Sequence, residues 1–549
     1  MRPLDGTQDK ICSTKIAPNW SAYVIFATNS SKQIRMNRQT YCRITGIFLL
    51  SMILFGCGSS KQSLTRVAET TPKHEFRGVW VQTVGQSRYR QMNSAAMKHY
   101  LSEMVRQFDE AGINAVIFQV RPEADAFYKS DLEPWSRFLT GEQGKAPDDP
   151  SFDPLAFIID ECHKRGMELH AWLNPYRVKT NLSNELASNH IYDRYPERFV
   201  QYGNQLFFDP GLPENRGFIC NVVHDIVARY DVDAIHMDDY FYPYPIAGTP
   251  FPDDRSFSRY AASQGFSSTQ RGDWRRNNVN LLIQQIKYTI AAEKPWVRFG
   301  VSPFGIYRNK RSTPDGSGSE TNGLQNYDDL YADIKLWVEK GWVDYNLPQL
   351  YWEIGHKAAD YTTLLHWWNA NNFEQPLYIG QDLKRSVDKN ELDVKIRQSR
   401  EMSFVQGNCY WYGYLMLDNY REVYDHLRSQ THRAKALIPA YTHMHKGRPA
   451  KVKKLADVFT EDMHFLTWEH PKQPRNPETA QRFVVYRFRK GERVDISRAE
   501  NIVKITPDNF FVLPYESGKS SYTYVVTALD AFHNESKPAT IKVKLSSHK

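Results

Sequence analysis

Three acidic residues stand at points in the sequence where short apolar runs end. Asp238 and Asp239 lie near the end of the run that begins at Asp233, and Glu353 follows the run that begins at Asp344. Cleavage of an acetal by acid–base catalysis uses two carboxyls with different pKa values, one that donates a proton and one that stabilises or traps the cation. These acids could do such chemistry only if the fold brings them together.

Between residues 76 and 415, short β-rich runs alternate with longer helical stretches, which predicts repeated βα units and a parallel sheet. Turn residues precede several runs, as in Ala111-Gly112 and Lys340-Gly341. Eight such units predict a (β/α)8 barrel of the TIM type, with functional side chains at the carboxyl ends of its strands. The expected strands are Phe76–Val84, Asn114–Pro122, Glu168–Tyr176, Asp233–Phe241, Arg298–Ile306, Asp344–Trp352, Pro376–Gln381 and Asn408–Leu415.

Alternation with a period of two residues divides the side chains of these runs between two faces. One face carries apolar residues such as Val116, Leu169 and Ile235. The other carries polar and aromatic residues, which pack poorly against outer helices but suit the mouth of a barrel. We expect substrate to be bound by Arg121, Glu123, His170, Trp172, Asn174, Tyr176, Arg177, His236, Tyr240, Gln349, Tyr351 and Trp352.

The acidic residues at two strand ends are the candidates for catalysis. The fourth and sixth strands are separated by one strand in barrel order, so their ends can face each other across the mouth. We assign Glu353 as acid/base, Asp238 as nucleophile or base, and Asp239 as a supporting group. The reverse assignment of the first two is also open, and each acid has a structural alternative as a loop cap or an ion-pair partner. Glu123 is expected to pair with Arg121.

The histidines and cysteines do not form a metal-binding pattern. His170 and His236 are single strand histidines, which more often belong to a polar core than to a metal site. The first strand has no His-x-His, and Cys162, Cys220 and Cys409 include no Cys-x-x-Cys pair. We therefore expect no metal, no cofactor and no disulfide framework.

The N-terminal region is typical of an export signal. A basic segment from Met36 leads into an apolar run from Ile44 to Gly56, which is too short for a membrane span. The sequence Leu54-Phe55-Gly56-Cys57 resembles the lipobox of bacterial lipoproteins. In those proteins the cysteine is lipidated and becomes the first mature residue, so the resemblance implies a lipid anchor at Cys57. An ordinary signal peptide is the alternative.

The signal divides the N-terminal region into segments that we exclude from the fold. We expect residues 1–56 to be the signal region, with 1–35 as an over-extended start, and residues 57–73 to be a small polar tether. No acidic cluster follows Cys57, which favours an outer-membrane anchor that faces the periplasm. The predicted location is therefore the cell envelope, with the membrane as a partner through the anchor.

The charge of the chain does not indicate a polyanionic partner. The formal net charge is +8, and the residues before Cys57 supply +5 of it, with seven Lys or Arg against two Asp. The remaining +3 includes no basic run of the kind that binds nucleic acid, so we expect no nucleic-acid partner. Aromatic residues make up 13% of the chain. Their rings can stack on sugars or fill a large core.

The pattern changes after about Lys435, where short alternating strands replace the βα units. Runs beginning at Phe483, Ile502, Phe510 and Tyr522 predict a small β-sandwich. The segment from Tyr524 to Ser536 resembles the closing strands of fibronectin type III modules. We place the barrel at residues 74–432 and the module, as a spacer or a sugar-binding unit, at 433–549. We expect a chain ending near Arg433 to remain folded.

Several motifs of the barrel resemble the bacterial family-10-like glycosyl hydrolases, which are often lipoproteins. These motifs are Phe76-Arg-Gly-Val-Trp-Val, Phe118-Gln-Val-Arg-Pro-Glu-Ala-Asp-Ala-Phe-Tyr, His170-Ala-Trp-Leu-Asn-Pro-Tyr-Arg, Asp233-Ala-Ile-His-Met-Asp-Asp-Tyr-Phe-Tyr-Pro and Gly300-Val-Ser-Pro-Phe-Gly-Ile. The resemblance covers about residues 74–430. It implies a β/α barrel that hydrolyses glycosidic bonds, and some members of the family act on peptidoglycan glycan strands stripped of their stem peptides.

Three functions remain open from the sequence. The first is a glycoside hydrolase that acts on an envelope or captured polysaccharide, with glycan strands as its partner. The second is a barrel that binds glycans without cutting them, which predicts binding but no turnover. The third is a metal-dependent deacetylase or amidohydrolase, which predicts sensitivity to chelators. The carboxyls at the strand ends favour the first.

Overall fold

The computed structural model describes residues 71–460, 463–469, 476–515 and 520–545. The predicted signal region, the lipidation site at Cys57 and most of the tether lie outside the described residues. None of the helices within the described ranges has the length and apolar character needed to cross a membrane.

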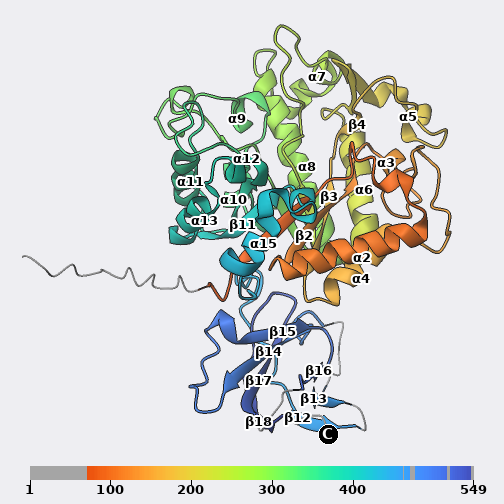
Figure 1. Cartoon of the computed structure of the whole chain (residues 1–549). Helices are drawn as coiled ribbons and strands as arrows, with labels where there is room; N and C mark the ends of the chain where they lie inside the picture. Colours follow the sequence, from red (N-terminus) through yellow and green to blue (C-terminus); the bar gives the residue numbers. More distant parts are fainter. Residues whose placement is uncertain (1–70, 461–462, 470–475, 516–519, 546–549) are drawn as a thin grey trace, which may run out of the picture. The chain divides into compact units, whose positions relative to one another are not determined.

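Eight parallel strands form a closed barrel, which confirms the predicted TIM-barrel class (Figure 1). Their order around the barrel is β1, β11, β10, β9, β8, β7, β3 and β2, so the last strand of the barrel pairs with the first. The strands are β1 (Phe76–Val81), β2 (Ala115–Arg121), β3 (Glu168–Leu173), β7 (Ala234–Met237), β8 (Arg298–Val301), β9 (Tyr345–Asn346), β10 (Leu377–Asp382) and β11 (Val405–Trp411).

Helices surround the strands, and each main helix buries one apolar side against the barrel (Figure 1). In α2 (Ser94–Glu110) the buried residues Met97, Leu101 and Phe108 recur at helical spacing, and the Asn93 side chain caps the first turn. The others are α4 (Pro154–His163), α6 (Pro213–Arg229), α8 (Arg271–Glu293), α10 (Ile334–Glu339), α11 (Tyr361–Ala370), α12 (Leu383–Asp388) and α13 (Leu392–Glu401). Shorter helices are α3 (Arg137–Thr140), α5 (Ile191–Arg194), α7 (Asp254–Tyr260), α9 (Asn326–Asp329), α14 (Tyr414–Leu417) and α15 (Val423–His426).

Large rings fill the inside of the barrel. Phe76 stacks on Tyr378 with ring centroids 3.9 Å apart, and Tyr345 lies beside both. Gly300 on β8 makes this packing possible, because a Cβ atom at that position would lie 1.9 Å from the Tyr345 ring. Ile438, which follows the barrel in the chain, joins the same inner cluster.

A small antiparallel sheet, which the sequence pattern did not predict, is inserted between β3 and α6. Its strands are β4 (Arg177–Lys179), β6 (Gln205–Phe208) and β5 (Phe199–Tyr202), in that order. Phe208 packs on Phe199 with ring centroids 4.5 Å apart, and β4 places Arg177 beside the mouth of the barrel. The insertion therefore helps to build one wall of the mouth.

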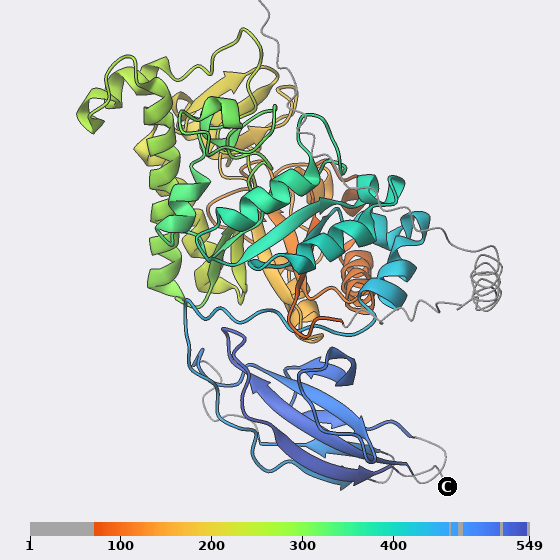
Figure 2. The same ribbon diagram turned by 90° about the vertical axis from the view of Figure 1, so that its left-hand side faces the viewer.

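The C-terminal module is a small all-β sandwich, as predicted (Figure 2). One sheet has the order β12 (Ala456–Phe459), β13 (His464–Thr467), β16 (Phe510–Val512), and the other has β15 (Ile502–Thr506), β14 (Arg482–Arg489), β17 (Ser521–Leu529), β18 (Ala539–Lys544). Trp468, Phe483 and Tyr524 are buried between the two sheets. This arrangement of two antiparallel sheets is shared by fibronectin type III domains.

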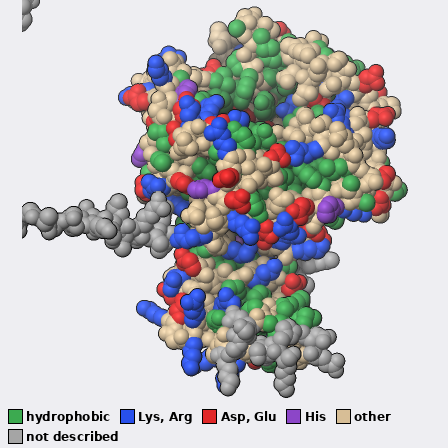
Figure 3. Space-filling view, in the orientation of Figure 1, with side chains coloured by type: hydrophobic (Ala, Val, Ile, Leu, Met, Phe, Trp, Pro, Cys, Tyr) green, Lys and Arg blue, Asp and Glu red, His purple; other side chains and the backbone are tan. Residues whose placement is uncertain are grey.

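The positive charge of the chain is concentrated in this module. Residues 433–549 include 21 Lys or Arg and 12 Asp or Glu, whereas residues 74–432 include 39 Lys or Arg and 47 Asp or Glu. The barrel is thus acidic and the module basic. Blue Lys and Arg side chains are frequent on the face of the module that Figure 3 shows.

The segment between barrel and module is paired with the first residues of the barrel. Leu437 donates its backbone N–H to the Lys73 carbonyl at 2.8 Å and accepts from the Glu75 N–H at 2.9 Å. The Arg77 side chain donates to the Ala434 carbonyl at 2.8 Å. The chain therefore enters and leaves the barrel through one hydrogen-bonded pair of segments.

Candidate active site

A cavity of about 370 Å³ opens at the carboxyl ends of the barrel strands. Its lining comes from the ends of several strands and from the segments that follow them, and both Asp238 and Asp239 belong to it. The lining residues are Trp80, Gln82, Val84, Gln119, Trp172, Arg177, Asp238, Asp239, Tyr240, Tyr244, Ser302, Phe304, Gln349, Tyr351, Trp352 and Trp411.

Asp238 is held by donors from β3 and from the residue after it. Its Oδ2 atom accepts hydrogen bonds from Asn174 Nδ2 at 2.5 Å and from Trp172 Nε1 at 3.2 Å. The orientation of the Asn174 amide is set because its Oδ1 atom accepts from Gln119 Nε2 at 2.6 Å and from Arg177 Nη2 at 2.7 Å. The Asp238 carboxyl is therefore fixed in the cavity wall.

Asp239 has a separate set of donors. Its Oδ2 atom accepts a hydrogen bond from the Tyr244 hydroxyl, and its Oδ1 atom accepts from Gln349 Nε2 at 3.1 Å. Gln349 is itself anchored, because the same nitrogen donates to the Ser302 carbonyl at 2.9 Å. Tyr244 stacks on Tyr240 with ring centroids 5.2 Å apart. The two neighbouring carboxyls are thus positioned independently.

The electrostatics of the two carboxyls favour a proton on one of them. Burial, together with the negative charge of Asp239, raises the pKa of Asp238 to about 7. Burial also raises the pKa of Asp239, while the hydrogen bonds from Tyr244 and Gln349 work in the opposite direction. Two buried carboxyls this close together cannot easily both ionise near neutral pH. The pair can therefore offer a proton donor beside a carboxylate.

Aromatic rings form much of the rest of the wall. Trp411 contacts Trp80, Trp172 and Tyr351, with ring centroids 6.3, 6.1 and 6.4 Å apart. Phe304 packs edge-on against Trp352 at 5.3 Å. Flat apolar faces beside polar groups suit a sugar ring, whose C–H faces are apolar and whose edge carries hydroxyls.

The comparison with known families decides which group this barrel belongs to. The model described as glycosyl hydrolase-like 10 matches residues 75–395, which is more than half of the chain. The chain belongs to the glycosyl hydrolase-like 10 family. Glycosyl hydrolase YngK of Bacillus subtilis (strain 168) is a relative with 38% identity over 508 residues, covering 89% of this chain and 97% of that protein.

A second relative is glycosyl hydrolase DigH of Escherichia coli (strain K12). It is 36% identical over 365 residues, which cover 61% of this chain and 80% of that protein. Among solved structures, the glycoside hydrolase domain of PgaB (BpsB) from Bordetella bronchiseptica has a TM-score of 0.44 and 10% identity. That match covers 64% of this chain and 98% of that domain.

Many of the predicted site residues meet in the cavity of this glycosyl hydrolase-like 10 barrel. Asn174 stands directly behind Asp238, as its hydrogen bond shows. The alternation of side chains along the strands selected four of them, Trp172, Asp238, Gln349 and Tyr351. The predicted residues that line the cavity are Asp238, Asp239, Trp172, Arg177, Tyr240, Gln349, Tyr351 and Trp352.

Glu353 does not reach the cavity, so the expectation that it faces Asp238 does not match the structure. Its side chain is 26% exposed, and its Oε2 atom lies 3.7 Å from Arg385 Nη1. The reason is local. Strand β9 has only the two residues Tyr345 and Asn346, so the period-two pattern that placed Glu353 on the inner face does not extend to it.

Arg121 and Glu123 are also outside the lining. The expected pair between them does not form, because each has another partner. Arg121 forms a buried bidentate pair with Glu133, at 2.8 and 2.6 Å. Glu123 pairs with Arg137 at 3.1 Å and accepts the Thr180 N–H at 2.6 Å. These contacts hold the loops after β2 and β3 in place, so both residues support the wall rather than contact substrate.

His170, His236 and Tyr176 are fully buried outside the lining. The two histidines lie inside the barrel, where both contact the Tyr345 hydroxyl, at 2.8 and 2.9 Å. In the described part of the chain, no group of three or more His, Cys, Asp or Glu side chains is arranged to hold a metal ion.

Some lining residues were absent from the sequence-based selection. Trp80 and Gln119 lie on strands with the expected alternation, so a wider application of that pattern would have found them. Trp411, the last residue of β11, could have been found in the same way, whereas Tyr244 lies in a loop and has no comparable signal. The others are Gln82, Val84, Ser302 and Phe304.

Proposed function

We propose that this protein hydrolyses O-glycosidic bonds in a polysaccharide of the bacterial envelope, with peptide-free peptidoglycan glycan strands as the first candidate substrate. The observation that carries the proposal is the pair Asp238 and Asp239, buried and separately held in an aromatic cavity at the carboxyl ends of the strands. The family and the names of its relatives support glycan hydrolysis in general.

In the proposed reaction the carboxyl pair supplies the proton for the leaving oxygen. Asp238, whose pKa is raised to about 7, carries this proton, and Asp239 remains a carboxylate that stabilises the positive charge on the sugar. Tyr244 and Gln349 favour the charged form of Asp239 because both donate to it. The barrel's net negative charge favours a glycan that is neutral or weakly charged over a polyanion.

The group that attacks the anomeric carbon is not a carboxyl placed opposite the pair. Among the described lining residues, Asp238 and Asp239 are the only acidic side chains, and Glu353 lies outside the cavity. The attacking group is then water or the 2-acetamido group of the sugar itself. Direct attack by water inverts the anomeric configuration, whereas assistance by the acetamido group retains it. The configuration of the first product, read by NMR, distinguishes the two routes.

Three amide variants test the assignment. Asp238→Asn and Asp239→Asn keep the shape of each side chain but remove its ionisation, so each should lower kcat by on the order of a thousandfold or more. Glu353→Gln is the matched control and should keep wild-type turnover. The measurement is the release of reducing ends from amidase-stripped peptidoglycan and from a panel of other glycans. A loss of activity in the control with unaffected aspartate variants would refute the assignment.

The same panel separates the alternative functions. A protein that binds glycan strands with normal affinity but releases no reducing ends from any of them would be a binding protein. Activity that disappears after dialysis against a chelator and returns with a divalent metal would indicate a metal-dependent deacetylase or amidohydrolase.

We also propose a lipid anchor at Cys57 that faces the periplasm. The Leu54–Cys57 motif after an apolar run supports it. Cys57→Ala should release the protein from membranes into the soluble fraction, and surface labelling of intact cells should not reach the wild-type protein. A Cys57→Ala variant that stays in washed membranes would contradict the anchor.

A further inference from the structure

A line of buried polar groups runs through the barrel from the C-terminal module to the cavity. His533 of the module places Nε2 at 2.6 Å from Glu168 Oε1, and the other oxygen of Glu168 lies 3.0 Å from His170 Nε2. The Tyr345 hydroxyl lies 2.8 Å from His170 Nδ1 and 2.9 Å from His236 Nδ1. All five residues are at most 4% exposed.

At the end of this line next to His533, the charge of Glu168 fixes the direction of the hydrogen bonds. Burial alone would raise the pKa of Glu168, but the charge of Arg298 and the hydrogen bonds from His170 and His533 hold it well below its usual value. Glu168 is therefore a carboxylate and can only accept. His170 must then donate from Nε2, and its Nδ1 atom faces the Tyr345 hydroxyl.

At the end of the line next to the cavity, Trp80 fixes the direction of the hydrogen bonds independently. Trp80 Nε1 lies 3.3 Å from His236 Nε2, and an indole N–H can only donate. His236 Nε2 must therefore accept, so its proton is on Nδ1 and points to the Tyr345 oxygen. Burial lowers the pKa of His236, which keeps the ring neutral. Both ends thus require one tautomer for each histidine.

The tautomer of His236 matters because this residue supports the cavity wall at Trp80. Its Nε2 atom contacts Trp80, which lines the cavity, and lies 2.9 Å from Ser302 Oγ. The Ser302 carbonyl accepts from Gln349, which also donates to Asp239. A proton on His236 Nε2 would oppose the Trp80 N–H and disturb this arrangement.

His533 keeps the Glu168 carboxylate in the arrangement that the line needs. Arg298 Nη2 donates to Glu168 Oε1, yet Arg298 Nε is buried and has no hydrogen-bond partner in the described part of the chain. Arg–carboxylate pairs often use two parallel bonds. Without the bond from His533, the carboxylate could turn to satisfy Nε with its second oxygen, and His170 would lose its acceptor.

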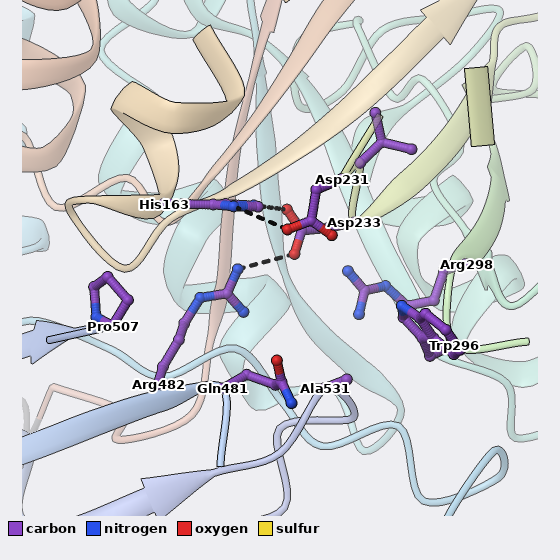
Figure 4. Close-up of a pocket in the computed structure, with 10 residues that line it drawn as sticks. His163, Asp231, Asp233, Trp296, Arg298, Gln481, Arg482, Pro507 and Ala531 are labelled. Atoms are coloured by element: carbon purple, nitrogen blue, oxygen red, sulfur yellow. Dashed lines mark hydrogen bonds and ion pairs between the residues drawn. The ribbon is translucent and has the colours of Figure 1, made fainter. Parts of the chain in front are cut away.

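The module is built to present this histidine. His533 has a left-handed backbone with φ of 61°, an unfavourable conformation that persists where surrounding contacts determine it. Asp530 Oδ1 accepts the N–H groups of Phe532 and Asn534 at 2.9 and 2.8 Å, which fixes the turn. A second contact joins the module to the barrel, because Arg482 of the module pairs with Asp233 of the barrel at 2.9 Å (Figure 4).

We propose that His533 of the C-terminal module is a positioning residue for the active site, acting through Glu168, His170, Tyr345 and His236 on the wall that contains Trp80. The module is then a part of the catalytic unit and not only a spacer. The effect on catalysis rests on the proposed glycosidase function, but the arrangement of protons can be measured without any substrate.

The test uses residues 70–549, which form one compact unit, labelled with 15N-histidine. Imidazole 15N shifts should show the proton of His236 on Nδ1 and that of His170 on Nε2. Tyr345→Phe and His533→Leu should both shift the His236 ring signals away from this single tautomer. His533→Gln retains an N–H donor and should restore the wild-type pattern. A wild-type His236 protonated on Nε2, or a His533→Leu spectrum identical to wild type, would overturn the proposal.

A control separates positioning from stability. Arg482→Gln removes the neighbouring ion pair to Asp233 without touching the buried line. It should lower the thermal midpoint but leave the ring signals of His170 and His236 unchanged. With a confirmed substrate, His533→Leu should lower kcat/KM by about tenfold, while His533→Gln and Arg482→Gln stay close to wild type. Absence of turnover in the wild type would count against the proposed function only, because the tautomer result stands separately.

Discussion

Asp238 and Asp239 show how much of a site can be predicted from single residues. Both were selected because they end an apolar strand, and the structure places both in the cavity. Their hydrogen bonds could not be predicted in the same way, because the donors Asn174, Tyr244 and Gln349 come from three separate segments. The raised pKa of Asp238 depends on burial, which only the assembled barrel supplies.

A pH dependence of stability follows from the raised pKa of Asp238. Its pKa is about 7 in the folded protein and about 3.9 in an unfolded chain. The folded protein therefore holds a proton that the unfolded chain releases. This contribution to stability is fully present below about pH 4 and is lost as pH rises through about 7. Asp238→Asn removes it.

Thermal melts of wild type and Asp238→Asn should therefore diverge as pH rises. The variant should melt higher than wild type by an amount that grows from about pH 5 to about pH 8, where it reaches a few degrees, because the wild type must then bury a charged carboxyl. Glu353→Gln, on a partly exposed side chain, should follow the wild type throughout. A constant difference between Asp238→Asn and wild type from pH 5 to 8 would contradict the raised pKa.

At the scale of elements, the eight strands were predictable and their exact extents were not. Apolar runs and the turn residues before them located every strand of the barrel. Along the sixth run Gln349 and Tyr351 line the cavity but Glu353 does not, because the alternation does not continue that far beyond the two residues of β9. The insertion β4, β5 and β6 was missed because its strands have only three or four residues each.

The contact between β8 and β9 gives a prediction at this scale. The Tyr345 ring overlaps the position that a Cβ atom on residue 300 would occupy. Gly300→Ala should therefore lower the free energy of unfolding by about 1–3 kcal/mol, by overpacking the barrel interior. It should also displace the Tyr345 hydroxyl from both histidines. Denaturant unfolding measures the first effect, and the histidine 15N signals report the second.

Gly217 on α6 provides the matched control. It is exposed, and a Cβ atom there would meet nothing within 4 Å. Gly217→Ala should stabilise the protein by about 0.5–1 kcal/mol, because alanine favours the helix. If Gly300→Ala were as well tolerated as Gly217→Ala, the close packing of β8 on the Tyr345 ring would not exist in solution.

At the scale of the whole molecule, the change from βα units to strands alone predicted that an all-β module follows the barrel, and the structure has one. It did not reveal how closely the module is joined to the barrel. Ile438 and Tyr441 complete the inner cluster of the barrel, and His533 satisfies Glu168. Contacts between residues more than 300 positions apart leave no periodic signal in one sequence. These contacts argue against the separate folding that the sequence pattern favoured.

We therefore expect a chain ending at Arg433 to aggregate or to lose its cooperative melt. The truncation removes apolar residues from the barrel interior and leaves Glu168 and Arg298 uncovered. A chain ending at Leu545 is the control, because it keeps every described contact. Size-exclusion chromatography and thermal melts measure the difference. A soluble, cooperatively folded chain ending at Arg433 would show that the barrel needs no help from the module.

The pairing of Leu437 with Lys73 and Glu75 also has a mechanical consequence. The bridge between His74 and Leu437 is parallel, so a pull on the tether and an opposite pull on the module load its two hydrogen bonds together, in shear. The ion pair between Lys73 and Glu535, at 2.5 Å, shares the same load. Tension applied between the N-terminal segment and the module would pass through these paired segments, and the strands that carry the cavity would remain unstretched.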